Sequence, residues 1–499
     1  MPRDCSISFL PASVSDGVLM QRDVFLPAAG YRNGSDLNNA GNNGHYWSRS
    51  LNEGNANNAY ELNFNSDNVD WNNNNRNNGQ SVRPVLPCHS TYLVFSTVPM
   101  AHPYLFSRNG LLADLYVAYL EARRHKRFRL YQLQFEANLM QNLNELFDEL
   151  ISRTYKPRPS TCFIIQDPKK REVFAADFRD RIVHHLYYNY THEFFERTFI
   201  ADSYSCIKGR GTHYGIARLE HHIRQASLNY TERAYALQMD IKGYFMHIDR
   251  QRLLDICLKT IDRYECKASS DLYEQEKLKL VRYLTEEIVM LDPIADCKIK
   301  GRAEDWQSLP HDKSLFHSPH GCGLPIGNLT SQLFSNIYMN VFDQFMKRQL
   351  AAQHYGRYVD DFYVVSPDKD WLRGLIPLVS DFLSSELALS LNEGKTMISE
   401  VHSGVSFLGA YLKPWRKYVR NETLGRMRRK VALVDEYAGG TGSEDEKPCA
   451  LRDSLSSFGG VLGHYKSFKI RQSLFLSMKN VQNYGSFDSE MLKFVIPSE

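Results

Sequence analysis

The feature that most constrains this chain is a pair of adjacent carboxylates between two strongly β-forming runs. In Tyr358-Val359-Asp360-Asp361-Phe362 the two acids have aromatic and β-branched neighbours on both sides. Two such runs around a short polar turn predict a β-hairpin whose turn carries the acids. Together with a third carboxylate from elsewhere, these would supply the hard oxygen ligands that a pair of Mg²⁺ ions requires. Asp is also common in solvent-exposed turns, so the motif alone leaves both interpretations open.

A third acid, Asp240, ends the apolar run that begins at Ala234. We expect a buried strand that delivers this carboxylate to its C-terminal end, where open sheets bind ligands. The alternative is that Asp240 caps the helix predicted from about Ile248. Caps directly precede their helix, and here a glycine-aromatic segment intervenes. Metal ligation is therefore the favoured interpretation.

Between the two acidic elements lies a glycine-rich turn, residues 321–327, followed by Leu333, Ile337 and Val341 at helical spacing. Glycines let a backbone approach a ligand closely, and a helix N-terminus offers N–H groups without intrahelical partners. An ordinary loop-to-helix junction has a similar composition. Along the chain come a strand that ends in Asp240, a glycine-rich turn that opens a helix, and a hairpin with Asp360 and Asp361. This order is a much more specific indication of function than any one of the three elements alone.

In that order the three elements resemble the palm of reverse transcriptases, over roughly residues 150–480. The resemblance implies an α+β right-hand polymerase fold with fingers, palm and thumb, and RNA-directed DNA polymerase activity. It implies an N-terminal helical region at 87–155, fingers and palm at 156–412 and a thumb at 413–499. Two Mg²⁺ ions would be the cofactor, with three catalytic Asp among the metal ligands Asp240, Ile241, Asp360 and Asp361.

The same resemblance implies roles for residues around the triphosphate. Lys170 and Arg171 would neutralise its charge, Phe245 would exclude a ribose 2′-OH, and Lys395 would serve as a general acid on pyrophosphate. The full nucleotide-binding set would be Lys170, Arg171, Phe245, Ile326, Gly327, Gln332 and Lys395.

A basic cluster between Lys413 and Lys430 is interleaved with Trp415 and Tyr418. Phosphate backbones attract such patches, and the aromatic rings can stack on bases. A solvated helical face would have the same composition, but the cluster follows residues 405–411, which resemble the primer-grip hairpin of the family, and this position favours a duplex-binding helix. The expected nucleic-acid-binding residues are Arg210, Arg426, Arg428, Arg429 and Lys430.

Two positions depart from the usual pattern of the family. Most reverse transcriptases have Gln at the position before Gly327, where this chain has Ile326. They have Pro at the position after Ser331, where this chain has Gln332. The string Ile-Gly-Asn-Leu-Thr-Ser-Gln resembles that of reverse transcriptases from diversity-generating retroelements, as do the flanks 313–318 and 354–357. This narrower resemblance implies that a template-repeat RNA is copied, with a primer and dNTPs, into cDNA that carries errors at adenines. The cDNA would then diversify a target gene.

The narrower resemblance also implies a small basic helical partner, the accessory variability determinant. An apolar Ile326 removes one polar contact around the nascent base pair, and apolar sites reject wrong partners less well than hydrogen-bonding ones. Lower fidelity is therefore the hypothesis for this residue. The alternative is a retron-, group II intron- or defence-type reverse transcriptase without a mutagenic role. An RNA-binding scaffold with an inactive palm is the rival from another class.

Residues 1–86 differ in composition from the rest. Eighteen Asn lie between Tyr31 and Gln80, and the first Lys of the chain is Lys126. Such tracts usually stay disordered, but 44–48, 59–64 and 81–85 read as strand pieces. They resemble part of a C-type-lectin-like, formylglycine-generating-enzyme-like domain. Because Asn codons are rich in adenine, we interpret the segment as a translated template repeat rather than an independent domain, with Met100 as a candidate start. A ligand-binding module is the competing interpretation.

The remaining composition indicates a reduced, cytoplasmic protein, and the retroelement resemblance implies a bacterial or phage origin. The nine Cys include no Cys-x-x-Cys pair, so neither a zinc site nor a disulfide framework is indicated. No apolar stretch approaches the length of a membrane span, and no membrane partner is expected. Residues 1–86 carry six basic and eight acidic side chains, a net charge of −2, so the polymerase-like part carries +5 of the chain's overall charge of +3.

Overall fold

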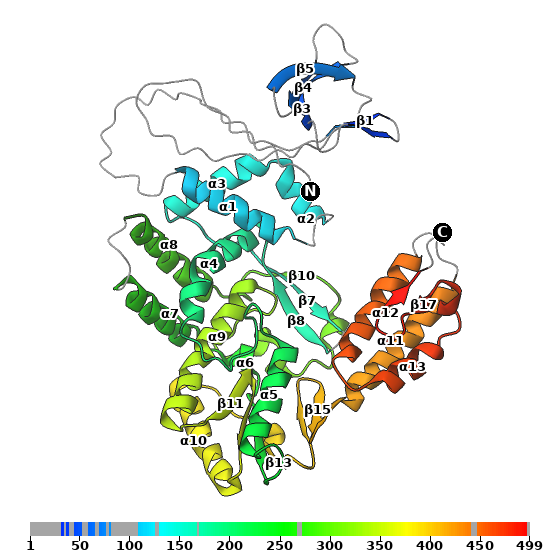
Figure 1. Ribbon diagram of the computed structural model, residues 1–499. Coiled ribbons are helices and arrows are strands. Elements are labelled where there is room, and N and C mark those ends of the chain that lie inside the picture. The colour runs from blue at the N-terminus through cyan, green and yellow to red at the C-terminus, as the bar shows by residue number, and fades with distance from the viewer. Residues whose placement is uncertain are drawn as a thin grey trace. The chain divides into compact units, whose positions relative to one another are not determined.

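The structure, a computed structural model, describes residues 31–33, 36–38, 44–51, 58–64, 69–75, 79–80, 108–124, 129–166, 169–266, 272–440 and 447–496. The chain divides into two compact units, Met1–Ala101 and His102–Glu499. Both contain sheets, and the second unit is a mixture of helices and mostly antiparallel strands (Figure 1).

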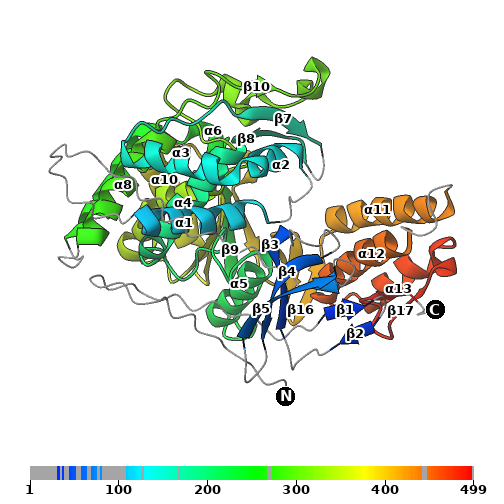
Figure 2. The same cartoon turned by 90° about the horizontal axis from the view of Figure 1, so that it is seen from above.

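The described part of the first unit consists of short antiparallel strands (Figure 2). The strands predicted at 44–48 and 59–64 are confirmed as parts of β3 and β4, while 81–85 lies outside the described residues. The Asn run 72–75 lies in β5, although Asn disfavours strands, because β5 pairs with β4 along its whole length. Sheet order is β3-β4-β5, with β3 (Gly44–Leu51), β4 (Asn58–Phe64) and β5 (Val69–Asn75), and β2-β1-β6, with β1 (Tyr31–Asn33), β2 (Asp36–Asn38) and β6 (Gly79–Gln80).

The second unit begins with helices and a small sheet. The sheet has the order β10-β7-β8, in which β7 and β8 are antiparallel and β10 pairs parallel to β7. A buried cluster including Cys162, Phe174 and Leu315 packs against this sheet. The elements are α1 (Arg108–Ala122), α2 (Leu130–Ala137), α3 (Leu139–Ile151), β7 (Thr161–Ile165), β8 (Arg171–Ala175), α4 (Phe178–Glu196), α5 (Thr212–Ala226) and β10 (Lys298–Ile299).

A four-stranded antiparallel sheet, ordered β11-β12-β9-β13, forms the centre of this unit. The predicted hairpin is confirmed, since β11 and β12 pair from His354↔Val365 to Tyr358↔Asp361. The strand predicted to end in an acid is also confirmed, because β9 ends at Asp240. The strands are β9 (Tyr235–Asp240), β11 (His354–Tyr358), β12 (Asp361–Ser366) and β13 (Met397–Glu400).

Helices cover both faces of this sheet, so its strands are apolar on both sides. Phe362 and Val364 of β12 pack into the main core with helix α9, while Tyr363 and Val365 pack into a second cluster with helix α5. This alternation is the period of two that a pleated strand imposes. The connecting helices are α6 (Tyr244–His247), α7 (Arg250–Glu265), α8 (Leu272–Val289), α9 (Leu329–Gln344) and α10 (Lys369–Leu387), with short helices at 303–306, 311–313, 315–317, 345–349 and 393–395.

The C-terminal part has a hydrophobic core of its own, formed by residues that include Leu424, Leu455 and Phe475. Helices α11, α12 and α13 lie side by side around it (Figures 1 and 2). Among the described residues, no helix is both long and apolar enough to span a membrane. The elements are β14 (Val405–Phe407), β15 (Ala410–Lys413), β16 (Arg416–Val419), α11 (Asn421–Gly439), α12 (Lys447–Gly463), α13 (Phe468–Leu476), a short helix at 481–483, β17 (Ser486–Phe487) and β18 (Phe494–Val495).

Candidate active site

Three carboxylates from two distant segments of the chain meet at one end of the central sheet. Asp361 is the direct cross-strand partner of Asp240, and Asp360 lies in the turn immediately before it. Carboxylate oxygens of all three lie within 4.8 Å of one another. The helix cap considered for Asp240 is wrong, because Asp249 caps α7 by accepting from the Arg252 N–H at 3.0 Å.

Electrostatics at this cluster favour an added cation. Burial and the neighbouring Asp240 raise the pKa of the Asp360 carboxyl to about 6. Burial, Asp360 and Asp240 raise the pKa of Asp361 to about 7. Like charges held this closely resist simultaneous ionisation. Three hard carboxylate ligands with excess negative charge fit a divalent cation such as Mg²⁺.

One lysine partly offsets that charge. Lys395 Nζ lies 2.7 Å from Asp240 Oδ2, and Asn392 Nδ2 donates to the same oxygen at 3.2 Å. Burial lowers the pKa of the Lys395 ammonium, but its hydrogen bond and charge interaction with Asp240 outweigh burial and hold it above its ordinary value. Ile241 follows Asp240 with a buried side chain, so only its carbonyl oxygen is suited to bind a metal.

A cleft of ≈ 740 Å³ opens at the three carboxylates. All seven residues predicted to bind the nucleotide line it, as does Ile241. The predicted nucleic-acid-binding residues are not among its lining residues. The members that the structure brings together are Asp240, Ile241, Asp360, Asp361, Lys170, Arg171, Phe245, Ile326, Gly327, Gln332 and Lys395.

The Gly-turn is docked on strand β8, so Ile326 and Gly327 of the turn and Arg171 of β8 line the same cleft. The Phe174 N–H donates to the Ile326 carbonyl at 2.9 Å, and the Ala176 N–H donates to Asn328 Oδ1 at 3.2 Å. Gly327 has φ 121°, and a Cβ there would lie 2.8 Å from Val173 Cγ1. A side chain at this position would therefore separate the turn from β8.

Sequence reasoning missed the contribution of the loop 303–318. Its Pro310, Asp312 and Lys313 line the cleft. The loop is tied to β8 by the buried Glu172 carboxylate, which accepts from Trp306 Nε1 at 2.8 Å, Ser314 Oγ at 3.0 Å and the Leu315 N–H at 2.7 Å. Lys170 also donates a hydrogen bond to this loop, at the Gln307 carbonyl. Cys206 and Leu408 were missed as well. In the sequence, the segments 203–213 and 405–411, which hold Cys206 and Leu408, resemble blocks of the family, and 313–318 resembles the narrower group, but none of these resemblances indicated a place in the cleft.

The predicted nucleic-acid-binding residues lie elsewhere. Arg210 Nη1 donates to the carbonyls of Ile200 at 3.1 Å and Ser203 at 2.8 Å, so part of its hydrogen-bonding capacity is used within the protein. On α11, Leu424, Met427 and Val431 are buried at helical spacing. The basic side chains occupy the rest of that helix: Arg428, Arg429 and Lys430 are exposed and Arg426 is half-buried.

Comparison with known proteins agrees with this geometry. Residues 167–412 match the family model described as reverse transcriptase (RNA-dependent DNA polymerase). Residues 167–412 thus form a reverse transcriptase domain, which supports RNA-directed DNA polymerase activity. Residues 14–85 match the model of a domain of unknown function, DUF8237.

More distant relatives are similar over longer stretches. The chain is 24% identical over 340 residues to Protein YkfC of Escherichia coli (strain K12), which covers 61% of this chain and 78% of that protein. Solved structures of telomerase from Candida tropicalis (apo, truncated from the C-terminal domain) and from Candida albicans (in complex with a fragment of telomeric RNA) are each 13% identical, with TM-score 0.38. These matches cover 56% and 70% of this chain, which spans only 60% and 62% of the telomerase chains.

Proposed function

We propose that this polymerase is the reverse transcriptase of a diversity-generating retroelement. It copies a template-repeat RNA into cDNA with errors at adenines, and the cDNA diversifies a target gene. The observation that carries this proposal is Ile326, an apolar side chain that lines the cleft next to Gly327 where most reverse transcriptases have Gln. Gln332, on the first turn of α9, lines the same cleft and is the second departure from the family pattern.

In the proposed chemistry Asp240, Asp360 and Asp361 hold two Mg²⁺, with the Ile241 carbonyl as a further ligand. Bound Mg²⁺ supplies Lewis-acid activation of the primer 3′-OH and neutralises charge on the leaving pyrophosphate. The protein's own groups orient and bind the nucleotide. Lys170 and Arg171 line the cleft beside the carboxylates and attract the triphosphate, and Lys395 can donate a proton to the pyrophosphate.

Phe245 and Ile326 would shape the part of the cleft that receives the base pair. Both are partly buried against the same small cluster as Phe174 and Leu315. An apolar wall provides shape but no directional hydrogen bond, so a mismatched pair loses little there relative to a correct one. This accounts for lower fidelity in general; the preference for adenine requires a further determinant.

The retroelement assignment also supplies partners and setting. We propose that the polymerase acts with the accessory variability determinant in a bacterial or phage-infected cytoplasm. The nucleotide sequence that encodes residues 1–86 is proposed to act as the template-repeat RNA. The match of residues 14–85 to a family model supports a segment that recurs in other proteins, as a copied repeat would.

The test is Ile326→Gln, with Ile294→Gln as its matched control. Ile294 is partly buried in the same cluster as Ile326, but it is not among the residues that line the cleft. We expect Ile326→Gln to lower misincorporation opposite template adenines by about 10-fold, the scale of a single well-placed contact. Ile294→Gln should leave it unchanged. The measurement is sequencing of cDNA made on a defined RNA template.

Two results would go against the proposal. Equal error rates at template adenines in the wild type and in Ile326→Gln would exclude a role of the Ile326 side chain in misincorporation. A wild-type enzyme that copies adenines as accurately as the other bases would favour a retron-, intron- or defence-type enzyme instead.

A further inference from the structure

The turn between β11 and β12, which holds Asp360 and leads into Asp361, contains a strained residue. Val359 has φ 58°, a left-handed conformation that is rare for a β-branched side chain. Such a conformation persists only where the surroundings impose it. Both backbone polar groups of Val359 are held by side chains: Arg357 Nη1 donates to its carbonyl at 2.9 Å, and its N–H donates to Ser205 Oγ at 3.2 Å.

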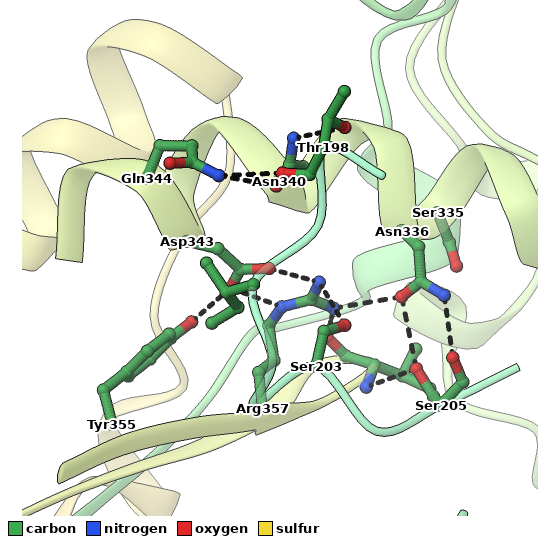
Figure 3. Close-up of polar contacts among 12 residues, drawn as sticks. Thr198, Ser203, Ser205, Ser335, Asn336, Asn340, Asp343, Gln344, Tyr355 and Arg357 are labelled. Atoms are coloured by element: carbon green, nitrogen blue, oxygen red, sulfur yellow. Dashed lines mark hydrogen bonds and ion pairs between the residues drawn. The ribbon is translucent and has the colours of Figure 1, made fainter. Parts of the chain in front are cut away.

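Arg357 is itself fixed by a buried ion pair with Asp343 on α9 (Figure 3). Nε donates to Asp343 Oδ1 at 2.8 Å and Nη2 to Oδ2 at 2.7 Å, and the side chains are 1% and 0% exposed. The Tyr355 hydroxyl donates to Asp343 at 2.6 Å. A buried pair of this kind contributes little net stability, because the desolvation of both charges offsets their attraction. A role in fixing geometry gives a physical reason for its presence.

Asn336, also on α9, completes the arrangement (Figure 3). Its Nδ2 donates to the Ser205 carbonyl at 2.8 Å, and its Oδ1 accepts from Ser205 Oγ at 3.2 Å and from Arg357 Nη1 at 3.4 Å. Asn336 is buried and lies one helical turn after Gln332, which lines the cleft. The same helix therefore reaches both the nucleotide and the metal-binding turn.

We propose that Arg357, Asn336 and Ser205 are positioning residues that hold the Val359 peptide so that the Asp360 and Asp361 carboxylates converge on Asp240. None of the three is among the metal ligands proposed above; they act through the backbone of the turn. Three like-charged groups would separate on a free turn, so the convergence has to be imposed by the protein. This inference rests on the proposed metal-binding role of the three acids and is independent of the retroelement role.

The structure offers a matched pair of substitutions, Ser205→Ala and Ser227→Ala. Both hydroxyls are buried, and each donates one hydrogen bond and accepts one backbone N–H. Ser227 Oγ donates to the Ile223 carbonyl at 2.7 Å and accepts from the Tyr230 N–H at 2.9 Å, at the end of α5. The two variants should lose similar thermal stability, because the deleted interactions are alike.

Only Ser205→Ala should change the site. We expect its kcat to fall by about 10-fold and its half-saturating Mg²⁺ concentration to rise by a similar factor, since small misplacements of reacting groups are costly. The KM for dNTP should stay near that of the wild type. In metal-free protein, hydrogen–deuterium exchange of the peptide spanning 358–362 should be faster in Ser205→Ala than in Ser227→Ala.

Arg357→Lys provides a second variant that keeps the positive charge opposite Asp343 but lacks the guanidinium fork that also reaches the Val359 carbonyl. It should show the same rise in Mg²⁺ requirement and the same faster exchange. Wild-type Mg²⁺ dependence and exchange in Ser205→Ala or in folded Arg357→Lys would overturn the positioning role. Substantial activity in Asp360→Ala would instead overturn the metal assignment, so the two failures are distinguishable.

Discussion

At the scale of single residues, the three carboxylates are arranged for function at a cost to stability. The raised pKa values of Asp360 and Asp361 mean that the metal-free folded protein holds their protons more tightly than the unfolded chain does. A carboxyl whose pKa is higher in the folded than in the unfolded state stabilises the fold at pH values below the unfolded pKa. That contribution is lost as pH rises through the folded pKa. For Asp361 the window extends from its ordinary value near 3.8 to about 7.

Asp361→Asn should therefore stabilise the metal-free protein at pH 8 and abolish polymerisation. The amide imitates the protonated carboxyl and removes one charge from beside Asp360 and Asp240. We expect a gain of about 1–2 kcal/mol in unfolding free energy at pH 8, shrinking toward zero near pH 4. Denaturant unfolding in EDTA at several pH values measures it. A variant less stable than the wild type at pH 8 would show that Asp361 is held by favourable contacts instead.

The convergence of the acids could be predicted from the sequence, because each follows from a local pattern. Asp240 ends an apolar run, and Asp360 and Asp361 lie between two β-forming runs, so antiparallel pairing of the two strands brings them together. Arg357 could not be assigned a role in this way. Its side-chain partners Asp343, Asn336 and Ser203 lie 14, 21 and 154 positions away in sequence, and no periodicity relates them.

At the scale of elements, the sequence predicted helix α9 but not the docking of the turn before it on strand β8. The Gly-turn predicts a helix that follows it. The docking of that turn on Phe174 and Val173 depends on a close approach that only the structure shows. The loop 303–318 has neither helical nor strand periodicity, and its order depends on one buried carboxylate, Glu172. Irregular segments held by single long-range contacts leave little trace in a sequence.

Helix α11 shows how a basic patch and an apolar stripe share one element. Leu424, Met427 and Val431 are buried, while Arg428 and Arg429 point outward. If α11 binds the template–primer duplex, Arg428→Gln with Arg429→Gln should weaken binding and lower the slope of log K against log salt by about 2, one for each phosphate that is no longer neutralised. Binding titrations at several salt concentrations measure that slope.

Arg452→Gln is the control for this pair, because Arg452 is a half-exposed arginine on α12 that already pairs with Asp453 at 3.1 Å. It should leave the slope within error of the wild type. If the α11 double variant and the control change the slope equally per charge removed, the effect reflects overall charge and α11 is not the binding surface.

At the scale of the whole molecule, the chain joins two units of opposite character. The first contains the Asn-rich strands and carries a small net negative charge, whereas the second contains the reverse transcriptase domain and all of the lysines. An acidic, lysine-free segment is poorly suited to bind nucleic acid as a protein. This contrast favours a role for the RNA that encodes residues 1–86 rather than for the peptide itself.

Three changes distinguish a role of the peptide from a role of the nucleotide sequence that encodes it. Deleting residues 1–86 should leave primer extension within about 2-fold of the wild type when template RNA is supplied in trans, because compact units of one chain usually act independently. A pair of compensating frameshifts around codons 30–86 changes the encoded amino acids but keeps nearly every nucleotide. It should leave the sequence copied into cDNA unchanged. Synonymous recoding of the same codons should change that cDNA although the peptide is intact. Loss of polymerase activity on deletion, with RNA in trans, would instead make this segment a working part of the protein.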